Sequence, residues 1–262
     1  MKIFYETHGA GEPLLLIPGF ASGAWNWFRQ IDDLSKDFKV ITFDPRGIGR
    51  SQAENEEDLT NLSMKLFADD VLQILNELDI EKVHILGASF GGFVAEKFAL
   101  NFPARLGKLI LACTSFGGAQ HVPPDLEVLL AFASTDGMNT TERIRKFMIP
   151  AFTSEFTAKF PETVEKVCQL RENSVVPEKV YMAQLTAATT FDYKDRVSDI
   201  KNETLIITGD KDKVVPMQNS INLAEKMPNA RLEIVKNGSH LFFVENADEF
   251  NRKVKEFILS ND

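Results

Sequence analysis

The chain has 262 residues, of which 44% are hydrophobic and 26% charged, a balance typical of a soluble globular protein that buries a sizeable core. Its net charge is −9, with no run of five or six like charges and no basic patch with interleaved aromatic residues, so neither nucleic acid nor stable membrane association is expected. The N-terminus lacks the long apolar core of a signal peptide, which favours a cytoplasmic protein. We expect a monomer or a homodimer.

Seven short, largely apolar runs predict the strands of a sheet. Several are continuous rather than alternating, as expected where both faces of a mostly parallel sheet are covered by helices. The fold class we predict is therefore α/β, with a doubly wound sheet. The expected strands are Ile3–Thr7, Leu14–Ile17, Lys39–Phe43, Val83–Leu86, Leu109–Cys113, Thr204–Thr208 and Arg231–Val235.

Helices are expected between the strands. Apolar residues recur at helical spacing from Met64 to Leu78, with Ser63 as a candidate N-cap, and further helices are expected over Gly91–Leu100 and Asp248–Leu259.

The alternation of strands and helices breaks between about Ser115 and Asp199. This stretch has helical patterns around 126–132, 140–147, 161–171 and 177–188, but no clear strand. It predicts a core domain of residues 1–114 and 200–262, with a helical cap of residues 115–199 inserted over the active site.

The strongest local motif is Gly87-Ala88-Ser89-Phe90-Gly91. It follows an expected strand and opens an expected helix, which is the context of a nucleophile elbow. The glycines leave room where backbone crowds backbone, and the helix N-terminus favours negative charge near the serine. A glycine-rich turn that contains a serine by chance is improbable in this context, so Ser89 is the expected nucleophile.

Four histidines are candidates for the base. His84 lies inside an expected buried strand, and His8 lies at the end of the first strand. His121 lies at the start of the cap, where it could contact substrate, although a solvated loop position is the ordinary interpretation. His240 lies in a loop after the last strand, at the edge where a doubly wound sheet places its site. We predict His240 as the base.

The acid is expected between the serine and the histidine in the chain. Asp210 and Asp212 both follow the strand Thr204–Thr208, and either carboxylate would hold the imidazole in the correct tautomer. Local chemistry does not separate the two.

Together these segments resemble the α/β-hydrolase family, and within it the small bacterial esterases, enol-lactonases and cofactor-free perhydrolases. The resemblance covers nearly the whole chain outside the cap. It rests on Pro18-Gly19-Phe20, on the D-x-R-G-x-G-x-S pattern of residues 44–51, on the elbow, on Gly209–Pro216 and on Gly238–Phe242. Many members have His-Gly where this chain has Pro18-Gly19.

The resemblance implies roles that the residues alone left open. The acid of this family precedes x-V/I-V-P, which selects Asp212 over Asp210. The oxyanion hole would use the backbone N–H groups of Phe20 and Phe90. A serine at position 89 disfavours the alkyl-halide and epoxide chemistry of relatives with an aspartate nucleophile.

The expected reaction is hydrolysis of carboxylic esters with small to medium apolar acyl groups. The expected partners are the ester substrate and water. Neither a metal nor a cofactor is expected, because the chain has no metal-binding or dinucleotide-binding motif. Cys113 and Cys168 are expected to be buried thiols. Lactone, carbon–carbon bond or peracid chemistry at the same triad and a ligand-binding signalling receptor are the alternatives. The residues expected to contact substrate are Gly19, Phe20, Phe90, Phe116 and Phe242.

Overall fold

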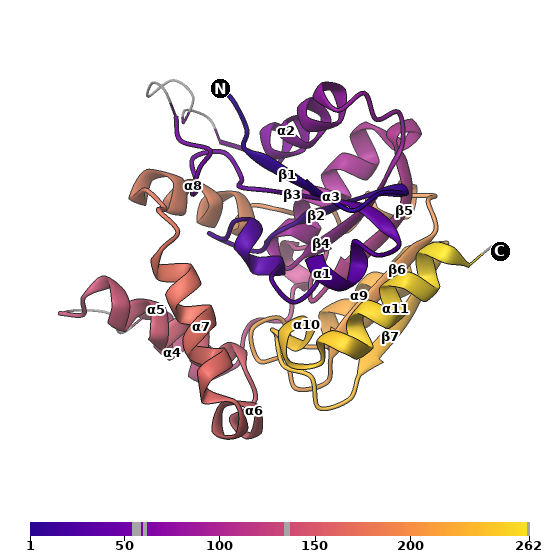
Figure 1. Cartoon of the computed structure of the whole chain (residues 1–262). Coiled ribbons are helices and arrows are strands. Elements are labelled where there is room, and N and C mark those ends of the chain that lie inside the picture. Colours follow the sequence, from indigo (N-terminus) through magenta and orange to yellow (C-terminus); the bar gives the residue numbers. More distant parts are fainter. Residues whose placement is uncertain (54–58, 60–61, 134–136, 261–262) are drawn as a thin grey trace.

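The structure is a computed structural model that describes residues 1–53, 59, 62–133 and 137–260. Seven strands form one sheet in the order β1-β3-β2-β4-β5-β6-β7, and all neighbours pair in parallel except β1 and β3 (Figure 1). The predicted fold class and all seven predicted strands are confirmed. The strands are β1 Tyr5–His8, β2 Glu12–Ile17, β3 Phe38–Phe43, β4 Val83–Ala88, β5 Leu106–Ala112, β6 Thr204–Gly209 and β7 Ala230–Val235.

The first strand begins two residues later than predicted. Ile3 is buried as its apolar character requires, but the Phe4 amide donates to the Ser51 hydroxyl at 2.8 Å rather than to the sheet. The chain therefore enters the core before it joins the ladder.

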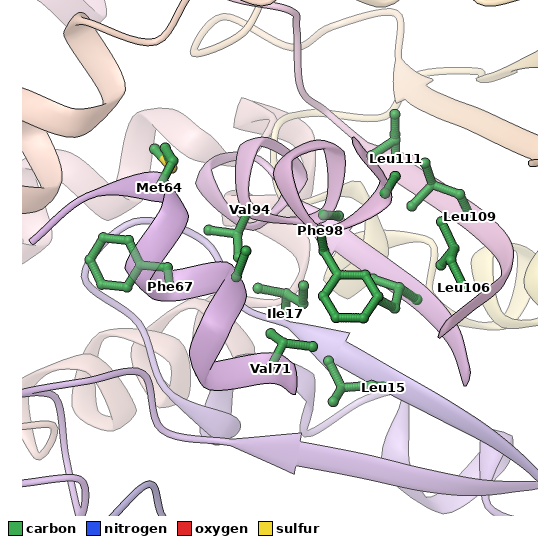
Figure 2. Close-up of a cluster of buried hydrophobic side chains, with 14 of the residues drawn as sticks. Leu15, Ile17, Met64, Phe67, Val71, Val94, Phe98, Leu106, Leu109 and Leu111 are labelled. Carbon is green, nitrogen blue, oxygen red and sulfur yellow. The ribbon is translucent and has the colours of Figure 1, made fainter. Parts of the chain in front are cut away.

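Helices cover both faces of the sheet. Alternate residues of β2 separate into two buried clusters: Leu15 and Ile17 belong to one, and Leu14 and Leu16 to the other. The first cluster includes residues of α2 (Met64–Glu77), α3 (Phe90–Asn101) and α9 (Gln218–Lys226), and Figure 2 shows α2 and α3 side chains meeting those of the sheet. The second includes residues of α1 (Ile31–Leu34), α10 (Phe242–Glu245) and α11 (Ala247–Leu259).

The predicted helices are present. The Ser63 hydroxyl caps α2 by accepting from the Leu66 amide at 3.3 Å, as its sequence position indicated. Among the described residues, no helix combines the length and apolar character needed to cross a membrane.

Among the described residues, five α-helices lie between β5 and β6 and project to one side of the sheet (Figure 1). Four were predicted, whereas the six-residue α6, capped by Thr153, is too short to show a helical period. Where this segment leaves and rejoins the core, its ends pair: Gly118 N donates to Phe191 O at 2.8 Å, and Tyr193 N to Phe116 O at 2.8 Å. The helices are α4 Leu126–Ala133, α5 Thr140–Met148, α6 Ser154–Lys159, α7 Pro161–Glu172 and α8 Glu178–Thr189.

Candidate active site

Ser89 occupies a sharp turn between β4 and α3, with φ +53° and ψ −117°. Such a conformation costs a non-glycine residue about 1–3 kcal/mol and persists only where its surroundings impose it. Here the flanking glycines allow it: a Cβ on Gly87 would lie 2.3 Å from the carbonyl oxygen of Gly91, and one on Gly91 would lie 2.2 Å from that of Ile17. Hydrogen bonds complete the turn, since Ser89 N donates to Ala112 O at 2.8 Å.

His240 and Asp212 form a buried hydrogen-bonded pair. The distance between His240 Nδ1 and Asp212 Oδ2 is 2.8 Å, and Asp212 Oδ1 accepts from the amides of Val214 and Val215 at 2.8 Å each. A carboxylate only accepts hydrogen bonds, so Nδ1 carries the proton and Nε2 is left as the basic nitrogen. Asp210, by contrast, is exposed.

Two glycines bring the loops of this pair together. A Cβ on Gly209, at the end of β6, would lie 2.1 Å from the carbonyl oxygen of Gly238. The close approach lets the loop that carries Asp212 lie against the loop that carries His240. The Ser239 amide donates to Glu245 Oε2 at 2.9 Å and so holds the histidine loop against α10.

Cys113 lies close both to the Ser89 backbone and to the Asp212–His240 pair. Its Sγ, an Asp212 carboxylate oxygen and a His240 ring nitrogen all lie within 4.8 Å of one another. Burial raises the pKa of the Cys113 thiol well above its usual range, the Asp212 charge raises it further, and a hydrogen bond with the Ser89 backbone opposes both effects. A protonated thiol beside a carboxylate that already has three hydrogen-bond partners is a poor set of metal ligands.

Sequence reasoning assigned Cys113 only a structural role as a buried thiol. The structure confirms that Cys113 and Cys168 are free and buried. Its place in the sequence could have located it at the candidate site. Cys113 ends a predicted central strand, at the same sheet edge as the other candidate residues.

The expected oxyanion loop lies directly against the elbow. A Cβ on Gly19 would lie 3.8 Å from Ser89 Cβ, and the Phe20 ring packs edge-on against Phe90, with 6.2 Å between ring centroids. Phe90 is the first residue of α3, so its N–H has no acceptor within the helix. Ala21 follows Phe20 in a left-handed conformation, with φ +52°.

The D-x-R-G-x-G-x-S segment is hydrogen-bonded to the residues that follow this loop. Asp44 Oδ1 accepts from the Ala24 amide at 2.8 Å, while Asp44 Oδ2 accepts from Arg50 Nε at 2.8 Å. Arg46 pairs with the buried carboxylate of Asp70. These contacts give the segment a structural role beside the site.

The phenylalanines expected to contact substrate lie in different surroundings. Phe20 is half-buried, and Phe90 is buried between Phe20 and Phe67. Phe116 belongs to the first core cluster. Phe242 has no exposed surface and packs edge-on against Phe250 in the second cluster, which is the position of a core residue.

Two other histidines have partners away from this site. His84 Nδ1 accepts from the Lys108 amide at 2.9 Å, and its Nε2 lies 3.2 Å from Glu12 Oε2. The ring of His121 is 2.9 Å from the Ser115 hydroxyl. Burial lowers the pKa of both rings, which keeps them neutral and structural.

An open groove of about 570 Å³ lies beside Asp212, between the loop of residues 210–218 and the start of α6. Charges of both signs line it, including Glu155, Asp210 and Lys211. Arg171, at the end of α7, lies close enough to Tyr181 of α8 to interact with it, and burial lowers the pKa of its guanidinium. In the part of the chain that the structure describes, Arg171 has no carboxylate partner.

The chain matches known proteins over nearly its whole length. The family model described as "alpha/beta hydrolase fold" matches residues 12–247. A 2-hydroxy-6-oxononadienedioate/2-hydroxy-6-oxononatrienedioate hydrolase of Pseudomonas putida is 30% identical, over 98% of this chain and 92% of the relative.

Two solved structures are similar throughout. The meta-cleavage product hydrolase of Pseudomonas fluorescens is 29% identical with a TM-score of 0.81, over 97% of this chain and 93% of that one. A thermophilic esterase of Thermogutta terrifontis is 27% identical with a TM-score of 0.81, over 98% of this chain and 92% of that one.

Proposed function

The chain belongs to the α/β-hydrolase family and is a hydrolase, and from this premise we propose that it cleaves carboxylic esters through Ser89, His240 and Asp212. The observation that carries the proposal is the buried hydrogen bond between Asp212 and His240, which leaves Nε2 basic, at the sheet edge where Ser89 is half-buried in its sharp turn. Residues 115–199 act as the cap of this site.

Acylation begins with the proton of the Ser89 hydroxyl. His240 Nε2 takes it while Oγ attacks the ester carbonyl carbon, and the carbonyl electron pair moves onto oxygen. Asp212 stabilises the imidazolium that forms. The backbone N–H groups of Phe20 and Phe90 stabilise the oxyanion, a kind of contact worth about 3 kcal/mol per donor.

Collapse of the tetrahedral intermediate expels the alcohol, which takes the proton from His240. Water then enters, His240 removes its proton, and the resulting hydroxide attacks the acyl-enzyme. Collapse of the second intermediate breaks the bond to Ser89 Oγ, which takes the proton back from His240 Nε2, and the carboxylic acid is released. The residues of this chain account for every proton transfer.

The substrate we propose has a small to medium apolar acyl group. The aromatic residues Phe20, Phe90 and Tyr181 gather beside the elbow and favour an apolar chain there. Gly19 lets that chain approach Ser89, because its missing side chain leaves the space next to Ser89 Cβ open.

Carbon–carbon bond hydrolysis is the second candidate. Two of the similar proteins are named as a dienedioate/trienedioate hydrolase and a meta-cleavage product hydrolase, whereas the third is named as an esterase. The same nucleophile, base and oxyanion hole would serve both reactions.

A substrate panel separates the candidates. We expect the purified protein to turn over p-nitrophenyl butyrate faster than a vinylogous 1,5-diketone or a six-membered lactone, with each activity lost in Ser89→Ala. Faster cleavage of the diketone would replace the ester by the second candidate. Ligand-dependent binding of a protein partner with negligible turnover would instead identify a signalling receptor.

A further inference from the structure

A side chain of the cap forms a hydrogen bond with the oxyanion loop. Gln184, on α8, is 1% exposed, and its Oε1 accepts from the Ala21 amide at 2.8 Å. One turn earlier on the same helix, the Tyr181 ring packs edge-on against Phe20, with 4.8 Å between centroids. Two residues one helical turn apart on α8 therefore contact two consecutive residues of the oxyanion loop.

The loop needs support at this point. Ala21 holds a left-handed φ of +52°, which a residue with a Cβ adopts only when neighbouring groups impose it. The Ala21 amide belongs to the peptide unit that follows Phe20, so its orientation is coupled to that of the Phe20 backbone. From the core side, Ser22 N donates to Gly19 O at a longer 3.2 Å.

The chemistry of Gln184 is poorly explained by stability alone. Its Nε2 is buried and has no hydrogen-bond partner in the described part of the chain. A buried amide with one unsatisfied end is less favourable than an apolar side chain of the same size. The contact that Gln184 does make is thus the reason for a polar residue at this position.

We propose that Gln184 is a positioning residue for the oxyanion hole, through which the cap holds the Phe20 N–H in its catalytic orientation. This inference rests on the proposed function, because Phe20 acts as a donor only in that reaction. It makes the cap a component of the catalytic machinery as well as a cover.

The cap has other attachments near α8, so loss of the Gln184 contact alone should not detach it. Gly49 N donates to Val175 O at 2.9 Å, just before the helix. Val180, one turn before Gln184, packs so closely on the core that a Cβ on Gly47 would lie 2.5 Å from it.

The test uses Gln184→Met, which keeps the length of the side chain and removes both hydrogen-bonding groups. The matched control is Gln169→Met, the same change at an exposed position of α7, where the side-chain amide donates to Glu165 Oε1 at 2.9 Å. A displaced donor misplaces the reacting geometry, so kcat for p-nitrophenyl butyrate should fall about 10- to 100-fold in Gln184→Met, with KM changed less than about threefold. The control should match the wild type.

Two readouts separate positioning from general loosening of the fold. The Ki of a trifluoromethyl ketone, whose adduct places an oxyanion in the hole, should rise in proportion to the loss of kcat/KM. Hydrogen exchange at the Ala21 amide should accelerate in Gln184→Met and return toward wild type in Gln184→Glu, which keeps an acceptor oxygen. If Gln184→Met does not fold, Gln184→Asn, too short to reach Ala21, takes its place.

A kcat of Gln184→Met within about twofold of wild type would overturn the proposal, as would a loss confined to KM. Absence of ester turnover in the wild type is a separate outcome. In that case the proposed substrate fails, and Gln184 is tested by the rate at which a fluorophosphonate labels Ser89. Because that reaction needs the same oxyanion hole, the labelling rate should also fall about 10- to 100-fold in Gln184→Met.

Discussion

Replacement of Asp212 by asparagine should disable the base without disturbing the fold. Asp212 Oδ1 accepts from the Val214 and Val215 amides, and Oδ2 accepts from His240 Nδ1. In Asp212→Asn the amide oxygen must stay with the two N–H donors, so the new NH₂ group faces the imidazole. It can only donate there, which forces Nδ1 to be the unprotonated nitrogen.

The wrong tautomer places a proton on Nε2, where the proton of Ser89 should be received. In a well-studied serine protease the same change lowers kcat about 10⁴-fold, or about 5–6 kcal/mol in the barrier, and a similar loss is expected here. The geometry that would force this tautomer is present, because both donors to Oδ1 are backbone amides, which can only donate.

Asp210→Asn supplies the matched control, since Asp210 is two residues away on the same loop and exposed. Steady-state kcat with p-nitrophenyl butyrate should be close to wild type in this variant, and urea denaturation should give both variants similar stability. Equal losses in the two variants, or a loss below about tenfold in Asp212→Asn, would refute the tautomer argument.

Further predictions concern stability and substrate range. Burial raises the pKa of Glu96 well above its usual range, and its carboxylate oxygens have no partner in the described residues. The unfolded chain therefore loses this proton at lower pH than the fold, so stability falls as pH rises, by about 1.4 kcal/mol per unit between the two pKa values. In urea titrations, Glu96→Gln should raise the free energy of unfolding more near neutral pH than at mildly acidic pH, whereas the exposed control Glu225→Gln should show no such pH dependence. A difference between Glu96→Gln and wild type that is the same at both pH values would contradict this. Across p-nitrophenyl esters, kcat/KM should peak between butyrate and octanoate, because each methylene adds about 0.8 kcal/mol until the pocket is full; a rise up to palmitate would contradict it. Neutral esters should be preferred to half-esters with a free carboxylate, and an anionic preference that is lost in Arg171→Met would show that this cation reaches the site.

Much of the fold could be predicted from local patterns. Continuous apolar runs predicted the strands and their mostly parallel arrangement, because parallel strands are buried on both faces. The strand order could not be predicted, since hydrophobic periodicity carries no information on which strands are neighbours. The antiparallel pairing of β1 with β3 depends on such a long-range choice.

Some residues of the candidate site could also be predicted from local sequence, whereas others could not. Ser89 and His240 could be located because their chemistry is tied to local transitions, a strand-to-helix turn and a loop after the last strand. Local chemistry did not separate Asp210 from Asp212, and only the family resemblance favoured Asp212; the fold gives the physical difference, since Asp210 is exposed while Asp212 bonds His240. Gln184 had no signal, because its partner Ala21 is 163 residues away.

The central claim is that Ser89 is the nucleophile of a hydrolase. Its most direct test is reaction of the purified protein with a fluorophosphonate, followed by mass spectrometry of the labelled peptide and by ester kinetics of Ser89→Ala. We expect a single adduct on Ser89, no adduct in Ser89→Ala, and a loss of kcat on the order of 10⁶-fold in that variant with its fold intact. An adduct on another residue, or a folded Ser89→Ala variant that keeps most of its esterase activity, would contradict it.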